Sequence, residues 1–310
     1  MKTYPMSLII IDEIFDPIGN SRNHKQLPIV HWPYVGMERK YGVQIKWISP
    51  QEEKSMHYTI DMCCASMKEG KALWKITKDN FYIDNEKPED HISLLALECA
   101  QPYYPFEFAA TKEGRIDSIL NTNKLQKRFV EAKPTLLQHY EGDIAIEYIE
   151  AIESSLHNAE QLKNIVTKDT WLSLFFAPIT GEYDYETKTK EITIEFPFVG
   201  FEDPFLFKGS SKIVNRSEKT ITVIFKGLLV LPAFIEEVPL TNGKIEISYD
   251  IDMHTYYIKN IMCEAAATTE QGEYKTTVNG YEKTVNKIIQ IKEEKPKPEP
   301  VGWMAFFKKD

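Results

Sequence analysis

Short runs of alternating apolar and polar residues recur on both sides of a middle segment that has helical spacing. The clearest runs cover residues 43–47, 58–63, 192–196 and 245–251. Successive side chains of a strand point to opposite faces, so these runs predict strands with one buried face. Several of the runs are separated by tight turns, which join antiparallel neighbours. The pattern therefore predicts an α+β protein that is predominantly antiparallel β.

Two Asn-Gly dipeptides predict further turns. Asn242–Gly243 precedes the alternating run 245–251, and Asn279–Gly280 precedes Tyr281–Lys292. Asn and Gly tolerate the positive φ angles of two-residue hairpin turns, so we expect a hairpin at each dipeptide. The stretch Ile92–Glu98 is ambiguous, because its length favours a strand and its continuous apolar run also allows a buried helical turn.

Residues 121–178 have helical spacing. Capping residues precede apolar stripes at several points, which predicts four or five short helices. They are expected to begin near Asn121, Asp143, Asn158 and either Thr167 or Asp169. A further helix is expected to begin near Pro134, which suits a first helical turn. This insert would either bridge two β-rich lobes or be wrapped by one long curved sheet. Both arrangements stay open, and we place the two-lobe arrangement first.

The chain accordingly divides into five segments. An irregular N-terminal lead-in (1–40) is followed by a first antiparallel β lobe (41–120) and the helical insert (121–178). A second antiparallel β lobe (179–292) and a Pro-rich spacer with an aromatic C-terminal tail (293–310) complete it. With 310 residues, 43% of them hydrophobic, the chain can form one large domain or two ordinary ones.

The net charge, the lengths of the apolar runs and the cysteine content indicate which classes of partner and which cellular compartment to expect. The formal net charge of −9 argues against nucleic acid as a partner, since binding to phosphate backbones favours a basic surface. No run approaches the roughly 18 apolar residues of a transmembrane helix, and Leu8–Ile11 is too short for a secretory signal. Cys63, Cys64, Cys99 and Cys263 form no C-x-x-C pair and suit a reducing compartment. We therefore expect a cytoplasmic protein.

Motifs for the common catalytic chemistries are missing from the sequence. It has no Gly-rich phosphate loop, no G-x-S-x-G elbow and no H-E-x-x-H pair. We therefore predict no catalytic residue and no cofactor. Asp250, Asp252 and His254 are candidates for a metal or acid–base site, because alternate strand positions share one face. The preferred interpretation is a solvated hairpin turn without a metal.

An aromatic cluster follows the run 192–196. Its members are Phe198, Phe201, Phe205 and Phe207, and prolines interrupt any regular strand pattern among them. Core packing beneath strand ends explains such a cluster. The alternative is a groove in which these rings line an apolar cavity between the sheet and the helices.

The last 18 residues differ from the rest of the chain. Charged residues alternate with prolines over 293–300, which favours an extended spacer, and an apolar cluster follows that contains Trp303, Met304, Phe306 and Phe307. Three interpretations stay open: the tail folds back on its own body, it docks on another protein, or it makes weak peripheral contact with a membrane.

These observations predict a non-enzymatic binding or accessory protein that acts through protein–protein contacts. The contact would use the C-terminal aromatic tail, a sheet edge or the aromatic groove, and the sequence does not identify the partner protein. The first alternative is a carrier of an apolar small molecule or lipid in a cavity between the curved sheet and the helices. The second is a hydrolase of unrecognised family. No family resemblance is evident in the sequence.

Overall fold

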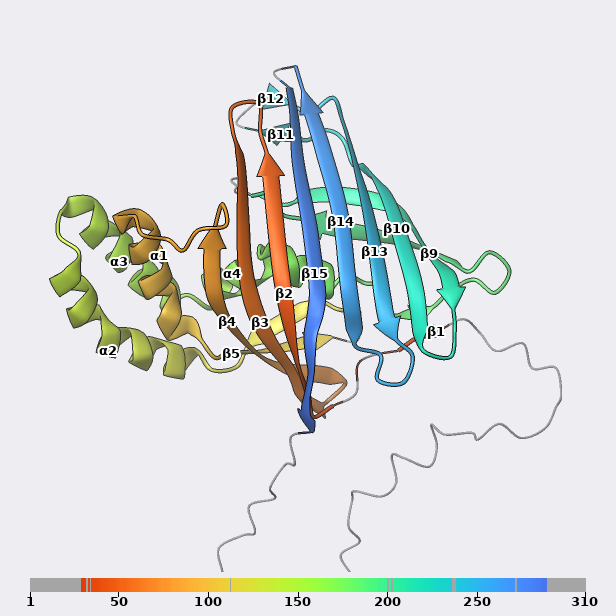
Figure 1. The fold of residues 1–310 in the computed structure, drawn as a ribbon, viewed down its shortest axis with the longest axis horizontal. Coiled ribbons are helices and arrows are strands. Elements are labelled where there is room, and N and C mark those ends of the chain that lie inside the picture. Colours follow the sequence, from red (N-terminus) through yellow and green to blue (C-terminus); the bar gives the residue numbers. More distant parts are fainter. Residues whose placement is uncertain are drawn as a thin grey trace, which may run out of the picture.

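One long antiparallel sheet dominates the computed structural model of the protein (Figure 1). The structure describes residues 29–288, apart from 32, 34, 112, 200, 202, 236, 237 and 271. Within these residues the sheet has 11 strands in the order β6-β5-β4-β3-β2-β15-β14-β13-β10-β9-β8. Their bounds are β2 (Met37–Ile48), β3 (Glu53–Lys68), β4 (Lys71–Ile83), β5 (Phe106–Thr111), β6 (Ile116–Ile119), β8 (Thr189–Phe196), β9 (Phe205–Arg216), β10 (Thr220–Leu229), β13 (Asn242–Asp252), β14 (Ile258–Thr269) and β15 (Gly272–Ile288).

The pairing of β2 with β15 joins the two β-rich segments of the chain. Val43 lies opposite Gly280 in this antiparallel ladder, and Ile45 lies opposite Val278. The predicted α+β, predominantly antiparallel fold is confirmed, and of the two arrangements left open the single long sheet is the one observed. Two small ladders accompany it, β1 (Ile29–Val30) with β7 (Gly181–Glu182) and β11 (Phe234–Ile235) with β12 (Val238–Pro239).

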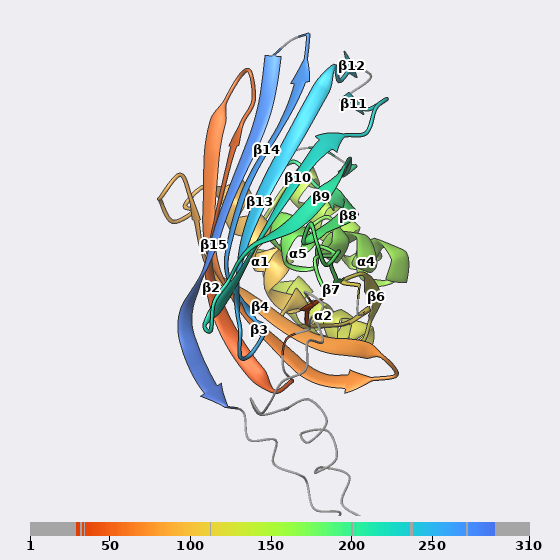
Figure 2. The same ribbon diagram turned by 90° about the vertical axis from the view of Figure 1, so that its right-hand side faces the viewer.

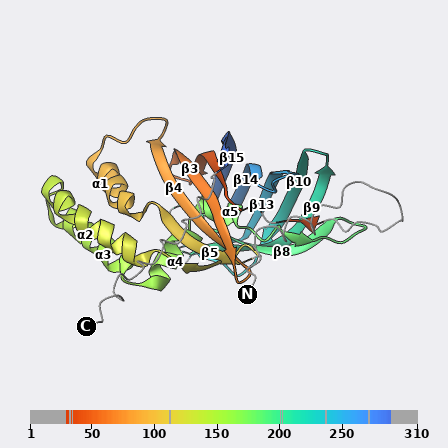
Figure 3. The same ribbon diagram turned by 90° about the horizontal axis from the view of Figure 1, so that it is seen from below.

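Helices lie beside the sheet and against its concave face (Figures 2 and 3). They are α1 (His91–Ala100), the short 3-10 helix η1 (Gln101–Tyr103), α2 (Thr122–His139), α3 (Asp143–Leu156), α4 (Ala159–Thr167) and α5 (Thr170–Phe175). Among the described residues, no helix combines the length and the apolar composition that a membrane crossing requires.

The helical segments settle one open alternative and contain one departure from the sequence-based expectations. Of the two structures left open for residues 92–98, the helix is observed, since they belong to α1, which the Asp90 side chain caps by accepting a hydrogen bond from the Ser93 N–H. No new helix begins at Pro134, since α2 continues through it. The predicted caps Asn158 and Asp169 do accept hydrogen bonds from the first turns of α4 and α5.

The core centres on α5, which lies inside the curve of the sheet (Figure 3). The Trp171 ring centroid is 5.4 Å from that of Tyr41 on β2, and its Nε1–H donates to Sδ of Met62 on β3 at 3.4 Å. Phe175 packs edge-on against Trp74 of β4, with ring centroids 5.5 Å apart. Six residues are too few for a stable isolated helix, so these contacts determine where α5 lies.

Neither Asn-Gly dipeptide forms the predicted hairpin turn. Asn242–Gly243 begins β13 and Asn279–Gly280 lies inside the continuous strand β15. A Cβ atom built on Gly280 would overlap the ring of Trp171. Gly280 is therefore required by the close approach of α5 to the sheet, which is the other common reason for glycine in a strand interior.

We expect Gly280→Ala to destabilise the protein by about 1–3 kcal/mol, because the added methyl group overpacks the contact with Trp171. The measurement is denaturant unfolding. Asn279→Ala is the matched control, since the neighbouring side chain is exposed on the other face of β15. Equal stability of the two variants would contradict this account of the core.

Candidate functional site

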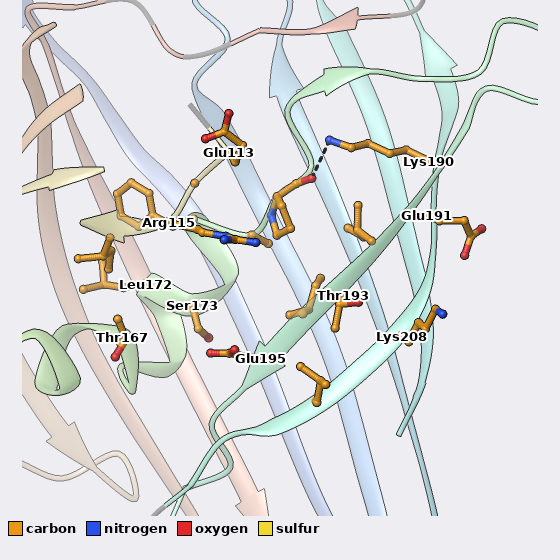
Figure 4. A pocket seen from close by; sticks show the side chains of 18 of the residues that line it. Glu113, Arg115, Thr167, Leu172, Ser173, Lys190, Glu191, Thr193, Glu195 and Lys208 are labelled. Atoms are coloured by element: carbon orange, nitrogen blue, oxygen red, sulfur yellow. Dashed lines mark hydrogen bonds between the residues drawn. The ribbon is translucent and has the colours of Figure 1, made fainter. Parts of the chain in front are cut away.

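A cleft of about 810 Å³ lies between the two ends of the sheet (Figure 4). Its walls come from β8, from the turn between β5 and β6, and from α4 and α5. Strands β6 and β8 are the first and last in the sheet order, and residues of both line the cleft, so the curvature of the sheet brings its two edges toward the same opening. A cleft of this volume is within the range of ligand-binding pockets.

One edge of β8 has no neighbouring strand within the described residues. The Lys188 carbonyl accepts a hydrogen bond from the Ile213 N–H at 3.0 Å. Along the antiparallel ladder with β9, this bond shows which residues of β8 direct their backbone N–H and C=O groups at β9. Even-numbered residues of β8 therefore direct their backbone groups at β9. The N–H and C=O groups of Glu191, Thr193 and Glu195 point the other way, toward the cleft.

The beginning of this edge is closed by the segment that follows α5. The Nζ of Lys190 donates a hydrogen bond to the carbonyl of Pro178 at 3.2 Å (Figure 4). It donates a second one to the carbonyl of Thr180 at 2.6 Å. Burial lowers the pKa of Lys190, and the charge of Glu113 opposes that shift. The Asp184 N–H also donates to the Thr189 carbonyl at 2.8 Å. The open part of the edge is thus residues 191–196.

The cleft combines an apolar floor with a charged rim. The buried residues Leu172, Phe176, Ile192 and Ile194 line its floor. The rim carries both signs of charge, with Arg115, Lys163, Lys208 and Glu195 among the lining residues. Glu191 points away from the cleft in Figure 4. Such a surface suits a ligand that is partly apolar and partly polar, such as a peptide.

The predicted aromatic cluster is brought together as packed rings. The Phe198 ring lies 5.2 Å from that of Phe205 and 6.4 Å from that of Phe207, and Phe201 contacts Tyr274 of β15 at 5.3 Å between centroids. Phe198, Phe205 and Phe207 are buried, whereas Phe201 is half-buried. The geometry is that of core packing, and a groove lined by these rings stays a prediction.

Asp250, Asp252 and His254 lie close in sequence, but the carboxylates of Asp250 and Asp252 have separate partners. Asp250 accepts a hydrogen bond from the Thr222 hydroxyl at 2.9 Å. Asp252 accepts from the backbone N–H groups of His254 at 3.0 Å and Thr255 at 2.9 Å, and it pairs with Lys259. Within the described residues no cluster of three or more His, Cys, Asp or Glu side chains could hold a metal ion.

The predicted tail residues and the backbone groups of β8 remain to be compared with the structure. Trp303, Met304, Phe306 and Phe307 of the predicted tail lie outside the described residues. The sequence reasoning missed the backbone groups at 191, 193 and 195 as binding groups. The alternating run identified β8 as a strand, but only the sheet order shows that it is an edge strand.

Asp252 gives a prediction about pH. Burial raises its pKa, but the hydrogen bonds from Lys259 and Thr255 outweigh burial and lower the pKa to about 2. The ionised carboxylate therefore stabilises the folded state above its ordinary pKa, and that contribution is lost as pH falls toward about 2. We expect Asp252→Asn to be less stable than the parent protein at pH 7, with the difference shrinking below pH ~4.

Denaturant unfolding at several pH values measures this difference. Asp203→Asn is the control, since the Asp203 side chain is 89% exposed and exposed ion pairs contribute little. A stability difference for Asp252→Asn that is the same at pH 7 and at pH ~2 would contradict the assignment.

Comparisons with known proteins give a likeness of fold alone. No family model and no curated protein matches the chain. Among solved structures, the chain is similar to lipovitellin in a study of its lipid–protein interactions, with a TM-score of 0.50 and 14% identity. The match covers 82% of this chain and 26% of that one, so this chain spans about a quarter of lipovitellin. At this identity the likeness supports a shared sheet architecture.

Proposed function

We propose that the protein is a non-enzymatic binding protein that receives an extended segment of a partner protein at the open edge of β8. The observation that supports this most directly is the row of backbone groups at Glu191, Thr193 and Glu195, which face the cleft. A peptide that adds as a further strand satisfies such groups with main-chain hydrogen bonds.

The surroundings of this edge favour a peptide over a smaller ligand. Ile192 and Ile194 offer apolar contacts to alternate side chains of an added strand, while Arg115, Lys163 and Glu195 can pair with its charges. Main-chain hydrogen bonds would supply affinity, and these side chains would supply specificity.

The two ends of the sheet are protected to different degrees. Edge strands are commonly kept short or covered, because unpaired backbone groups invite association with other chains. β6 has four residues and packs against α4. β8 has eight residues, and the described structure covers only its beginning. The uncovered part is long enough for three pairs of backbone groups.

Thr193→Pro tests strand addition, because it removes one N–H from the open edge and none from the ladder with β9. The probe is a phage-displayed library of random heptapeptides selected on the full-length protein. We expect selected peptides to bind Thr193→Pro about fivefold to tenfold more weakly than the parent protein, since one main-chain hydrogen bond is lost. Calorimetry measures the affinities.

Thr193→Ala is the matched control, because it removes the side chain and keeps the N–H. Strand addition requires that this variant bind the selected peptides as the parent protein does. Enrichment of no peptide, or equal binding to Thr193→Pro and to the parent protein, would refute the proposal.

The C-terminal tail is proposed as a second contact with a partner protein. The tail residues Trp303, Met304, Phe306 and Phe307 are of types enriched at interfaces, and a Pro-rich stretch precedes them in the sequence. Deletion of 293–310 is expected to remove a co-purifying partner without changing the melting temperature. A lower melting temperature would instead indicate that the tail packs on its own body, and reduced liposome sedimentation would indicate membrane contact.

A carrier of an apolar small molecule or lipid is the second candidate function. It is favoured by the curved sheet with helices against its concave face and by the fold likeness to lipovitellin, which has been studied for its lipid–protein interactions. Native mass spectrometry of the purified protein tests it, since a carrier should retain an apolar ligand.

A further inference from the structure

A second pocket, of about 240 Å³, lies between β4 and β5 of the sheet and the helices α1, α3, α4 and α5. Its wall on α1 is made by two small residues, Ala96 and Ala100, which leave room for a ligand. Tyr148 and Ile165 also line it, and both side chains are partly exposed, so they mark its opening. Ile76 contributes apolar surface from β4.

An ion pair lies in the wall of this pocket, whose other lining residues are apolar or are tyrosines. Lys78 of β4 is only 8% exposed, and its Nζ donates to Oδ2 of Asp169, which precedes α5. The other oxygen of Asp169 accepts from the Leu172 N–H at 2.9 Å. The Lys78 Nζ also lies 4.5 Å from the ring centroid of Tyr58. Both residues of the pair line the pocket, and these contacts hold their charged groups in position.

The two charges balance each other inside the protein. Burial works against the charged form of Lys78, but the carboxylate of Asp169 outweighs it and raises the pKa of Lys78. The ammonium group of Lys78 is therefore charged at neutral pH, and the ion pair with Asp169 offsets that charge. A charged ligand would add an uncompensated buried charge, which is costly. An uncharged group is not penalised in this way.

The pair also offers hydrogen bonds of both kinds. An ammonium group has three donors, and a carboxylate accepts through two oxygens that each have two lone pairs. Lys78 uses part of its hydrogen-bond donors on Asp169 and on the face of the Tyr58 ring. A hydroxyl group can accept from Lys78 and donate to Asp169 at once, which a purely apolar molecule cannot do.

We propose that this pocket binds a small, uncharged, apolar molecule that carries one hydroxyl group, held between Ala96 and Ala100 on one side and the Lys78–Asp169 pair on the other. This inference deepens the carrier function, on which it rests, and is independent of strand addition at β8. The pocket and the cleft share Leu172 as a lining residue, so Leu172 is left unchanged in the tests.

Calorimetric titration of the full-length protein with octan-1-ol, octanoate and octylamine tests the proposal. We expect octan-1-ol to bind, and each charged homologue to bind at least about tenfold more weakly, because its charge is buried without a partner. Ala96→Phe and Ala100→Phe fill the pocket and should each weaken octan-1-ol binding by about tenfold or more. Ala151→Phe is the matched control, since Ala151 is exposed on α3.

Lys78→Met provides a test of the charge argument. This variant leaves the carboxylate of Asp169 without its partner, so the preference should change from octan-1-ol to octylamine, whose ammonium group replaces that of Lys78. A merely structural role of the ion pair would not reverse the preference. Should Lys78→Met fail to fold, the two pocket-filling variants still decide whether this is the binding site.

Three results would overturn the proposal: no binding of octan-1-ol by the parent protein, binding unchanged in both pocket-filling variants, or octanoate bound as tightly as octan-1-ol. Native mass spectrometry separates these results from failure of the carrier function. An apolar ligand that is retained equally by the parent protein and by Ala96→Phe would leave the carrier function standing and remove this pocket as its site.

Discussion

The packing of α5 against the concave face of the sheet is the contact on which the other features depend. Trp171 occupies the space that Gly280 leaves free, and Phe175 packs against Trp74 on another strand. The Tyr249 hydroxyl adds a hydrogen bond to the Leu174 carbonyl at 3.1 Å. Strands from both halves of the chain thus contact one helix, which favours a single curved sheet over two separate lobes.

The same helix separates the two sites. The segment that follows α5 is held to β8 by Lys190, which leaves the cleft open beyond that point. The residue that precedes α5, Asp169, pairs with Lys78 in the wall of the second pocket. A six-residue helix has little stability of its own, so polar contacts at its two ends and aromatic contacts between them fix its position.

Much of the fold could be predicted from the sequence because side-chain alternation is a local property. The runs 192–196 and 245–251 lie within strands β8 and β13, and Asn158 and Asp169 cap helices as expected. The errors arose where distant contacts override local preference. Together with Asn279, Gly280 looks in the sequence like a hairpin turn. The structural reason for the glycine is instead the ring of Trp171, more than a hundred residues away in the chain, which leaves no room for a side chain.

The candidate sites were harder to predict for the same reason. Thr193 is an ordinary strand residue in the sequence, and only the sheet order shows that its backbone groups face no strand among the described residues. Lys78 and Asp169 are 91 residues apart, and nothing in the spacing of either predicts a buried pair. Both sites depend on where the chain brings two segments together, and that is set by the packing around α5. Asp169 both caps α5 and pairs with Lys78, so the contact that positions the helix also places a buried ion pair in the wall of the second pocket.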